Sequence, residues 1–152
     1  MSISGFNKML ALQAAFVTES AAIATYHWIG RGNEKSADKA AVDAMRNELN
    51  KMNIDGEIVI GEGERDEAPM LFIGEKVGTG DGPKVDIALD PLEGTTLTAK
   101  NMANALSVMA FSPRGRMLNA PDTYMEKIAI GRDFPKNIID LDLGIEKNIK
   151  LN

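Results

Sequence analysis

One run of sequence decides the fold of this chain: residues 85–95 read VDIALDPLEGT. Four of its first five residues are apolar and two of these, Val85 and Ile87, are β-branched, which predicts a strand; the DPLEGT segment predicts an abrupt end to that strand. A short helix is expected to begin there and to run to about Met102. A second run, EIVIGEGE at residues 57–64, repeats the arrangement of an apolar strand followed by an acidic, glycine-rich loop. If the two strands are neighbours in one sheet, both acidic loops lie at the same edge.

Two helices are predicted ahead of these strands. The first covers residues 7–29 and ends at the glycines of Gly30-Arg31-Gly32. The second covers residues 37–52, with Ser36 as its N-cap and Asp38 in its first turn. Asp55-Gly56 is expected to form a turn. Further strands are expected at 105–111, 124–130 and 138–141, and a terminal helix is expected from residue 145, so the sequence predicts a mixed α and β domain.

Composition excludes several classes of function. The 152 residues carry a net charge of −5, which gives no basic surface for nucleic acid. The absence of cysteine excludes disulfides, thiolate zinc sites and a cysteine nucleophile, and a single histidine, His27, cannot hold zinc by itself. The apolar runs near the N-terminus are too short and too interrupted to span a membrane. A cytoplasmic protein without nucleic-acid or membrane partners is expected.

The acidic residues are concentrated in one part of the chain. Residues 55–93 contain eleven acidic and three basic side chains, a net charge of −8, whereas the rest of the chain carries +3. Acidic residues gathered among glycines are typical of a cation site.

Three acidic positions are candidates for that site: Glu62 and Asp90 follow the two predicted strands, and Asp38 begins a helix. Carboxylates that converge stay ionised only beside a strong positive charge, which a divalent cation supplies. Oxygen ligands favour Mg²⁺ or Mn²⁺, with the Leu92 carbonyl as a possible addition. The simpler alternatives are that Asp38 only stabilises its helix and that the GEGE loop is a solvated turn.

The DPLEGT segment is the more specific signal. Pro91 stiffens the turn, Gly94 permits close backbone approach, and Thr95 offers a hydroxyl and an amide at a helix start. A cation site beside an anion site is what the hydrolysis of a phosphate ester requires.

These motifs resemble a known family. DPLEGT is similar to the Asp-Pro-[Ile/Leu]-[Asp/Glu]-Gly-[Thr/Ser] signature of the metal-dependent sugar and inositol phosphatase superfamily. GEGERDEAPML at residues 61–71 and IGEKVG at 73–78 resemble the class II, bacterial fructose-1,6-bisphosphatases. Similar segments occur elsewhere: VTESAA at 17–22, GRG at 30–32, AD at 37–38 and LNAPDTYMEK at 118–127.

The resemblance implies an α/β fold of layered type, in which a helix pair packs on a mixed β-sheet as half of an αβαβα sandwich. It implies hydrolysis of the 1-phosphate of fructose 1,6-bisphosphate, a step of gluconeogenesis, with a homo-oligomer expected. The implied metal ligands for Mg²⁺ or Mn²⁺ are Asp38, Glu62, Asp90, Glu93 and the Leu92 carbonyl. The implied phosphate-binding residues are Glu93, Gly94 and Thr95, and the implied sugar contact is Tyr124. Thr95 would orient the attacking water, and either Glu62 or Glu64 would accept its proton.

The chain departs from the family in two respects. At Asn33-Glu34-Lys35 the basic residue stands one position later than expected. The family's chains also continue well beyond Asn152, so residues 1–152 are expected to form an N-terminal metal- and phosphate-binding domain, or the product of a shortened gene. Apolar surface is then expected on the face that the remainder would cover. Two alternatives stay open: an inactive remnant or subunit, and a related phosphatase acting on sedoheptulose 1,7-bisphosphate or inositol monophosphate.

Overall fold

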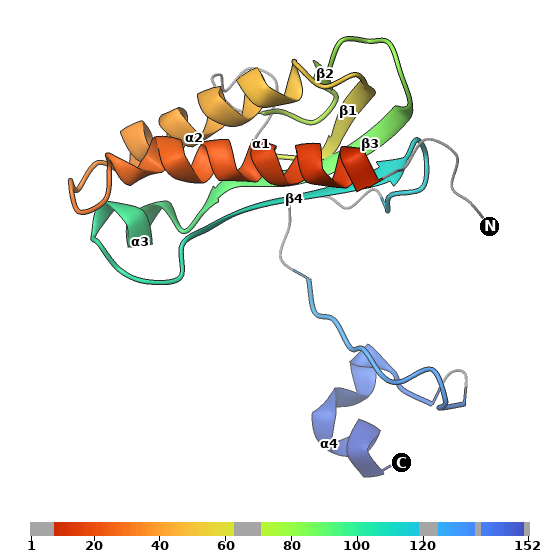
Figure 1. Ribbon diagram of the computed structural model, residues 1–152. Coiled ribbons are helices and arrows are strands. Elements are labelled where there is room, and N and C mark those ends of the chain that lie inside the picture. Colours follow the sequence, from red (N-terminus) through yellow and green to blue (C-terminus); the bar gives the residue numbers. More distant parts are fainter. Residues whose placement is uncertain (1–7, 63–70, 119–124, 136–137, 151–152) are drawn as a thin grey trace. The chain divides into compact units, whose positions relative to one another are not determined.

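The computed structural model describes residues 8–62, 71–118, 125–135 and 138–150. The chain forms two compact units, residues 1–120 and 121–152 (Figure 1). In the described ranges, none of the helices combines the length and the apolar composition that crossing a bilayer requires.

The first unit contains a helix pair and a mixed four-stranded sheet, which confirms the predicted α/β class. The sheet order is β2-β1-β3-β4, with β1 parallel to β3 and the other pairs antiparallel. The elements are α1 (Lys8–Tyr26), α2 (Glu34–Leu49), β1 (Asp55–Ile60), β2 (Lys76–Val77), β3 (Lys84–Glu93), α3 (Thr95–Ala99) and β4 (Leu106–Pro113).

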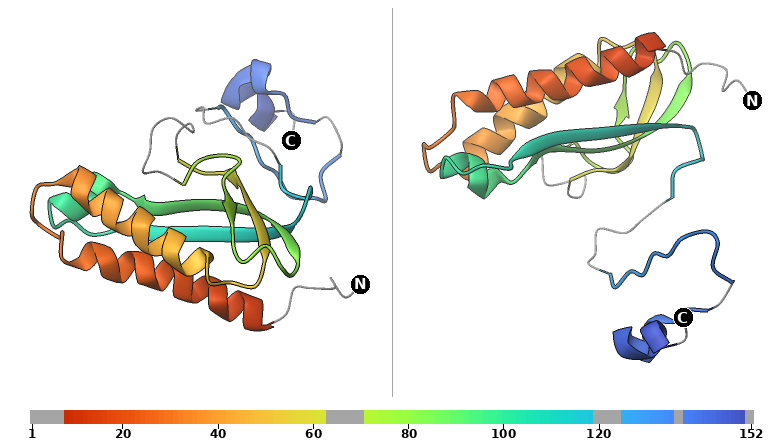
Figure 2. Two further views of the ribbon diagram at one scale, coloured as in Figure 1. Left: turned by 90° about the horizontal axis from the view of Figure 1, so that it is seen from above. Right: turned by 60° about the horizontal axis from the view of Figure 1, so that its bottom comes forward.

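Both long helices lie on one face of the sheet (Figures 1 and 2). Apolar side chains from each layer fill the space between them and are fully buried, among them Val17, Met45, Ile58 and Ile87. The alternation of β3 explains this packing, since Val85, Ile87 and Leu89 all belong to the core.

The opposite face of the sheet is apolar in part. Along β4, Met109 and Phe111 pack against the core, whereas Leu106 and Val108, on the other face, are 51% and 47% exposed. Leu106 and Val108 therefore leave apolar side chains exposed on the side of the sheet away from α1 and α2.

Several predicted boundaries were wrong in the first unit: the three helices end at Tyr26, Leu49 and Ala99, each three residues earlier than predicted, and two predicted starts also differ. Helix α2 begins at Glu34 because the Asn33 side chain, and not Ser36, is the cap: Asn33 Oδ1 accepts a hydrogen bond of 3.0 Å from the Ser36 amide. Asp55 and Gly56 form the start of β1 instead of a turn, and Gly56 pairs with Val77 of β2.

The second unit departs further from the predicted strands. Residues 125–130 have no regular secondary structure, and residues 141–143 form a 3₁₀ turn, η1 (Leu141–Leu143), instead of a strand. The Asp140 side chain caps this turn by accepting a hydrogen bond from the Asp142 amide. The predicted terminal helix is confirmed as α4 (Gly144–Lys150), which the buried Asn148 side chain ties to the Asp140 backbone with bonds of 2.9 and 2.7 Å.

Arg114 joins β1 and β3 just after the end of β4. Its Nη1 lies 2.8 Å from Glu57 Oε2, and its Nη2 donates to the Asp55 carbonyl at 2.8 Å. Its Nε lies 3.1 Å from Asp86 Oδ1, an ion pair that lacks hydrogen-bond alignment. Asp86 is almost completely buried and also accepts a bond of 2.6 Å from the Gly115 amide. Arg114 therefore neutralises carboxylates that the sheet holds out of water.

We expect Arg114→Gln to lower the free energy of unfolding by roughly 3 kcal/mol, because it leaves the buried Asp86 carboxylate without its cation. The matched change Lys39→Gln breaks an exposed pair with Asp43 and should cost at most about 0.5 kcal/mol. Urea unfolding monitored by circular dichroism measures both. Equal stability of the two variants would contradict the role given to Arg114.

Candidate active site

The parallel pairing of β1 with β3 places their acidic ends at the same edge of the sheet. Asp55 pairs with Lys84 at the start of the ladder and Ile60 pairs with Ala88 near its end. Glu62 follows β1 by two residues, and Asp90 lies two residues beyond Ala88. This pairing confirms the prediction that β1 and β3 are neighbours and that their acidic ends lie at the same edge of the sheet.

Each of these strands has an irregularity close to the acidic end. In the β1–β3 ladder the register shifts between Ile58 and Ile60, and in the β3–β4 ladder it shifts between Asp90 and Glu93. In a regular strand, residues three apart point to opposite faces. A bulge can re-aim a side chain, and bulges are common beside active sites. Here the extra residue in β3 brings Asp90 and Glu93 close enough for their carboxyl groups to hydrogen-bond.

The turn after Asp90 is fixed by its own side chain. Asp90 Oδ1 accepts a hydrogen bond of 3.0 Å from the Leu92 amide, and the Pro91 and Leu92 side chains are buried beneath the turn. Gly94 follows with φ of +93°, a conformation that favours glycine, and α3 begins at Thr95. Because α3 has only five residues, its dipole adds little to anion binding. The polar groups that could contact an anion here are therefore the Thr95 hydroxyl and the nearby backbone amides.

The backbone next to Glu62 is held by a close contact. The Glu62 amide donates to the Leu71 carbonyl at 3.1 Å. A Cβ at Gly61 would lie 2.4 Å from the same carbonyl oxygen, so only glycine allows this approach. Gly61, the first glycine of the GEGE motif, therefore helps to position Glu62 by allowing this close contact.

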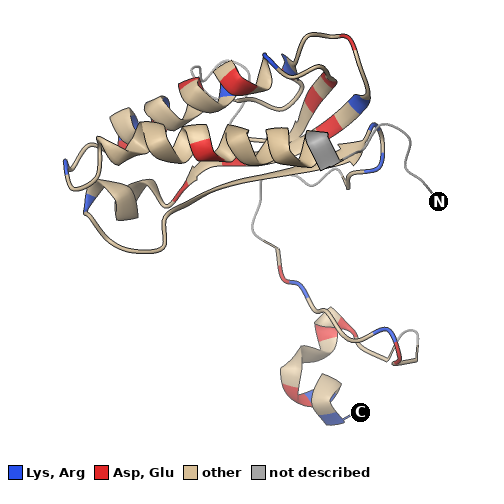
Figure 3. Ribbon diagram, viewed as in Figure 1, with Lys and Arg blue, Asp and Glu red and all other residues tan. Residues whose placement is uncertain are grey.

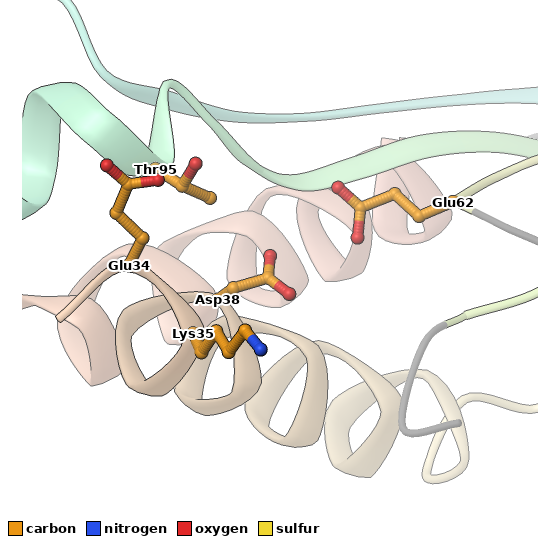
Figure 4. A pocket seen from close by; sticks show the side chains of 5 residues that line it. All are labelled: Glu34, Lys35, Asp38, Glu62 and Thr95. Carbon is orange, nitrogen blue, oxygen red and sulfur yellow. The ribbon is translucent and has the colours of Figure 1, made fainter. Parts of the chain in front are cut away.

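Helix α2 supplies the other side of the site. A pocket of about 290 Å³ is lined by Glu34, Lys35, Asp38, Glu62 and Thr95. Figure 4 shows the carboxylates of Asp38 and Glu62 facing each other across it, with Glu34 beside Thr95. The structure therefore brings together Asp38, Glu62 and Thr95, which are far apart in sequence.

The electrostatics of the site reflect crowded carboxylates. Burial, together with the neighbouring charges of Asp38, Asp90 and Glu93, raises the pKa of Glu62 to about 8. Burial raises the pKa of Asp38, and the hydrogen bond with Asp90 raises the pKa of Glu93. Glu62 Oε2 is buried and has no hydrogen-bond partner. An unpartnered carboxylate oxygen facing other acids is a position suited to a cation.

The donor types match a hard divalent cation, since carboxylate oxygens are the groups that Mg²⁺ and Mn²⁺ prefer. Within the described ranges, however, no three acidic or histidine side chains already enclose a single metal position. The carboxylates are thus close enough to perturb one another's pKa, and binding a cation requires their side chains to draw together.

Sequence reasoning assigned the site incompletely. It did not include Glu34, and it gave no role to Lys35, yet both line the pocket because the Asn33 cap places them in the first turn of α2. Glu64 and Tyr124, which were predicted as a proton acceptor and a sugar contact, lie outside the described residues. The ligand and phosphate roles of Asp38, Glu62, Asp90, Leu92, Glu93, Gly94 and Thr95 stay predictions.

The raised pKa of Glu62 predicts a dependence of stability on pH in the metal-free protein. Between pH 4.5 and about 8 the folded protein holds this proton more tightly than the unfolded chain, so the free energy of unfolding falls as pH rises through that interval. Glu62→Gln should remove this fall and should be the more stable protein near pH 8 by roughly 1–3 kcal/mol. Urea unfolding in EDTA at several pH values measures it, with Glu48→Gln as control, because Glu48 is partly exposed and lies outside the pocket. The same pH slope in Glu62→Gln and the unmodified chain would contradict the assignment.

Comparison with known proteins identifies relatives of the chain. The family profile described as bacterial fructose-1,6-bisphosphatase, glpX-encoded, matches residues 8–151. A class 2 fructose-1,6-bisphosphatase 1 of Escherichia coli K12 is 60% identical over 141 residues, which cover 93% of this chain and 42% of that protein. The class 2 protein of Haemophilus influenzae is 54% identical over 144 residues, covering 95% and 43% respectively. The chain thus spans about two-fifths of the length of these relatives.

Proposed function

The chain belongs to the bacterial fructose-1,6-bisphosphatase family, and we propose that it supplies the cation- and phosphate-binding part of an enzyme that hydrolyses the 1-phosphate of fructose 1,6-bisphosphate. The products are fructose 6-phosphate and phosphate, and the reaction belongs to gluconeogenesis in the cytoplasm. The observation that carries the proposal is the unpartnered, buried oxygen of Glu62 among the acids Asp38, Asp90 and Glu93, beside the pocket that contains Thr95.

The residues that would hold Mg²⁺ or Mn²⁺ are Asp38, Glu62, Asp90 and Glu93, with the Leu92 carbonyl as a further oxygen. When bound, such an ion stabilises charge on phosphate oxygens and lowers the pKa of a coordinated water. The raised pKa values of Glu62 and Glu93 support this assignment, because neighbouring carboxylates contribute to both and a cation would offset their repulsion; burial alone raises the pKa of Asp38.

The remaining groups would act on the phosphate and the water. The backbone of Glu93 and Gly94 and the Thr95 hydroxyl would hold the scissile phosphate. Thr95 would also orient the attacking water, and Glu62 or Glu64 would accept its proton. Lys35, the one cationic side chain among the described residues that line the pocket, would add positive charge on the phosphate side.

A second candidate function is a cation-binding subunit or remnant without hydrolytic activity. The observation that favours it is that, within the described residues, no three acidic or histidine side chains enclose a single metal position. Hydrolysis of sedoheptulose 1,7-bisphosphate or inositol monophosphate by the same groups is a further alternative within the superfamily, which a panel of phosphorylated substrates would distinguish.

We predict that phosphate release from fructose 1,6-bisphosphate with Mg²⁺ or Mn²⁺ falls at least about 100-fold in Asp38→Asn and in Asp90→Asn. The matched control is Asp43→Asn, which removes an exposed carboxylate from the same helix as Asp38. This control should retain near-normal activity. Equal activity in all three variants would contradict the proposed reaction.

Calorimetry with Mn²⁺ distinguishes the two candidate functions. An enzyme site should bind Mn²⁺ and then fructose 1,6-bisphosphate, and Asp38→Asn should weaken Mn²⁺ binding at least about 10-fold while Asp43→Asn leaves it unchanged. A subunit without hydrolytic activity should bind Mn²⁺ and show no heat with the sugar bisphosphate. Equal Mn²⁺ affinity in Asp38→Asn and Asp43→Asn would exclude the assigned ligands in either case.

A further inference from the structure

The loop between α1 and α2 connects the ends of three helices. Its last four residues are Gly30, Arg31, Gly32 and Asn33, and we call them the helix junction. Helix α1 ends just before the junction, and α2 begins directly after it. Figures 1 and 2 show that α3, which comes much later in the chain, lies beside the same loop.

The helix junction binds the carbonyl groups at the end of α3. The Gly30 amide donates to the Thr98 carbonyl at 2.9 Å, and the Gly32 amide donates to the Ala99 carbonyl at 2.9 Å. The last carbonyls of a helix have no partner within the helix, so bonds from outside hold its end. Thr98 and Ala99 are also buried. The position of the C-terminal end of α3 therefore depends on the junction.

The helix junction is itself attached to both long helices. The Arg31 amide donates to the Trp28 carbonyl at 3.2 Å, and Arg31 Nε donates to the His27 carbonyl, just after the end of α1. Arg31 is the basic residue of this loop (Figure 3). On the other side, the Asn33 side chain accepts the Ser36 amide and so caps α2. The junction thus fixes α3 relative to α1 and α2.

Of the two helices that line the pocket, α3 is the one that can move. Helix α3 has only five residues, and the residue before it, Gly94, has no side chain with which to cap it. A helix of this length is not stable by itself, so the groups that hold it set its position. Helix α2, in contrast, is fixed by side chains that are fully buried in the core: Ala37, Ala41, Val42, Met45 and Leu49.

Thr95 lies close enough to the helix junction to follow its movements. Thr95 begins α3 and stands one turn before Ala99, and Figure 4 shows it across the pocket from Asp38 of α2. At 1.5 Å per residue, Thr95 is about 6 Å from the end of α3, so a rotation of about 10° at that end shifts Thr95 by roughly 1 Å. A misplacement of about 1 Å can lower the rate of an enzyme about 100-fold.

We propose that the helix junction is a positioning element for the proposed hydrolysis: by holding the end of α3, the Gly30 and Gly32 amides keep the Thr95 hydroxyl in place opposite Asp38. The inference rests on the proposed function, which assigns Thr95 to the phosphate and the attacking water. Neither glycine is among the described residues that line the pocket. Both are therefore positioning residues, which act through Thr95.

Gly32 is the position at which the backbone can be changed with the least other disturbance. Its φ is +67°, in the left-handed region, which few residues besides glycine and asparagine adopt readily. A Cβ at Gly32 would have none of the described atoms within 4 Å, so alanine there strains the backbone without a steric clash. Asparagine at the same position should be tolerated.

Gly80 offers a matched control for the same backbone strain. Its φ is +83°, a Cβ there would also have none of the described atoms within 4 Å, and its amide donates to the Ile54 carbonyl at 3.0 Å. Gly80 lies in the loop that precedes β3, whereas the candidate site lies at the other end of that strand. Gly80→Ala therefore reproduces the strain of Gly32→Ala away from the site.

Hydrogen exchange in the metal-free protein tests whether the junction holds α3. Gly32→Ala should speed exchange of the amides of residues 98–102 at least about 10-fold, because the end of α3 opens more often when its outside bonds are weakened. Gly80→Ala and Gly32→Asn should leave exchange in this segment unchanged. Mass spectrometry of the exchanged peptides measures it. Equal exchange in Gly32→Ala and Gly80→Ala would overturn the proposal.

Calorimetry tests the consequence for the site, with inorganic phosphate titrated into protein saturated with Mn²⁺. Gly32→Ala should weaken phosphate binding at least about 10-fold, as Thr95→Val should, because both remove the hydroxyl from its place. The affinity for Mn²⁺ alone should stay within about twofold, because none of the assigned metal ligands is on α3. Gly80→Ala and Gly32→Asn should bind both ions as the unmodified chain does.

The outcomes distinguish this inference from the function on which it rests. If Thr95→Val weakens phosphate binding and Gly32→Ala does not, the positioning role is wrong and the proposed function stands. If Gly32→Ala and Gly80→Ala weaken phosphate binding equally, the effect is a general loss of stability and the positioning role is again wrong. If the unmodified chain with Mn²⁺ does not bind phosphate, or if Thr95→Val binds it equally well, the proposed phosphate site is wrong and the inference fails with it.

Discussion

The parallel pairing of β1 with β3 is the constraint on which the rest of the site depends. It brings two acidic strand ends to one edge of the sheet, where like charges repel. Ile58, Ile87 and Leu92 belong to the same buried core as residues of the helix pair, and this core holds the strands in register. The core thus maintains an arrangement that the carboxylates would by themselves oppose, as the proposed cation site requires.

Much of this arrangement is predictable from sequence because its signals are local. The apolar runs at 57–60 and 85–89, the glycines after them and the acids Glu62 and Asp90 all stand within a few residues of one another. The register shift between Asp90 and Glu93 is not local, since a bulge exists only relative to the strand that pairs with it. Sequence spacing alone would have placed these two carboxylates on opposite faces of the strand.

The wrong predictions have the same physical origin. Residues 125–130 have the composition of a strand, but a strand forms only with a partner, and none of the described segments pairs with them. Ser36 and Asn33 are both good caps, and the choice between them depends on which side chain reaches a free amide; Asn33 reaches the amide of Ser36. That shift of three residues is also what brings Glu34 and Lys35 into the pocket.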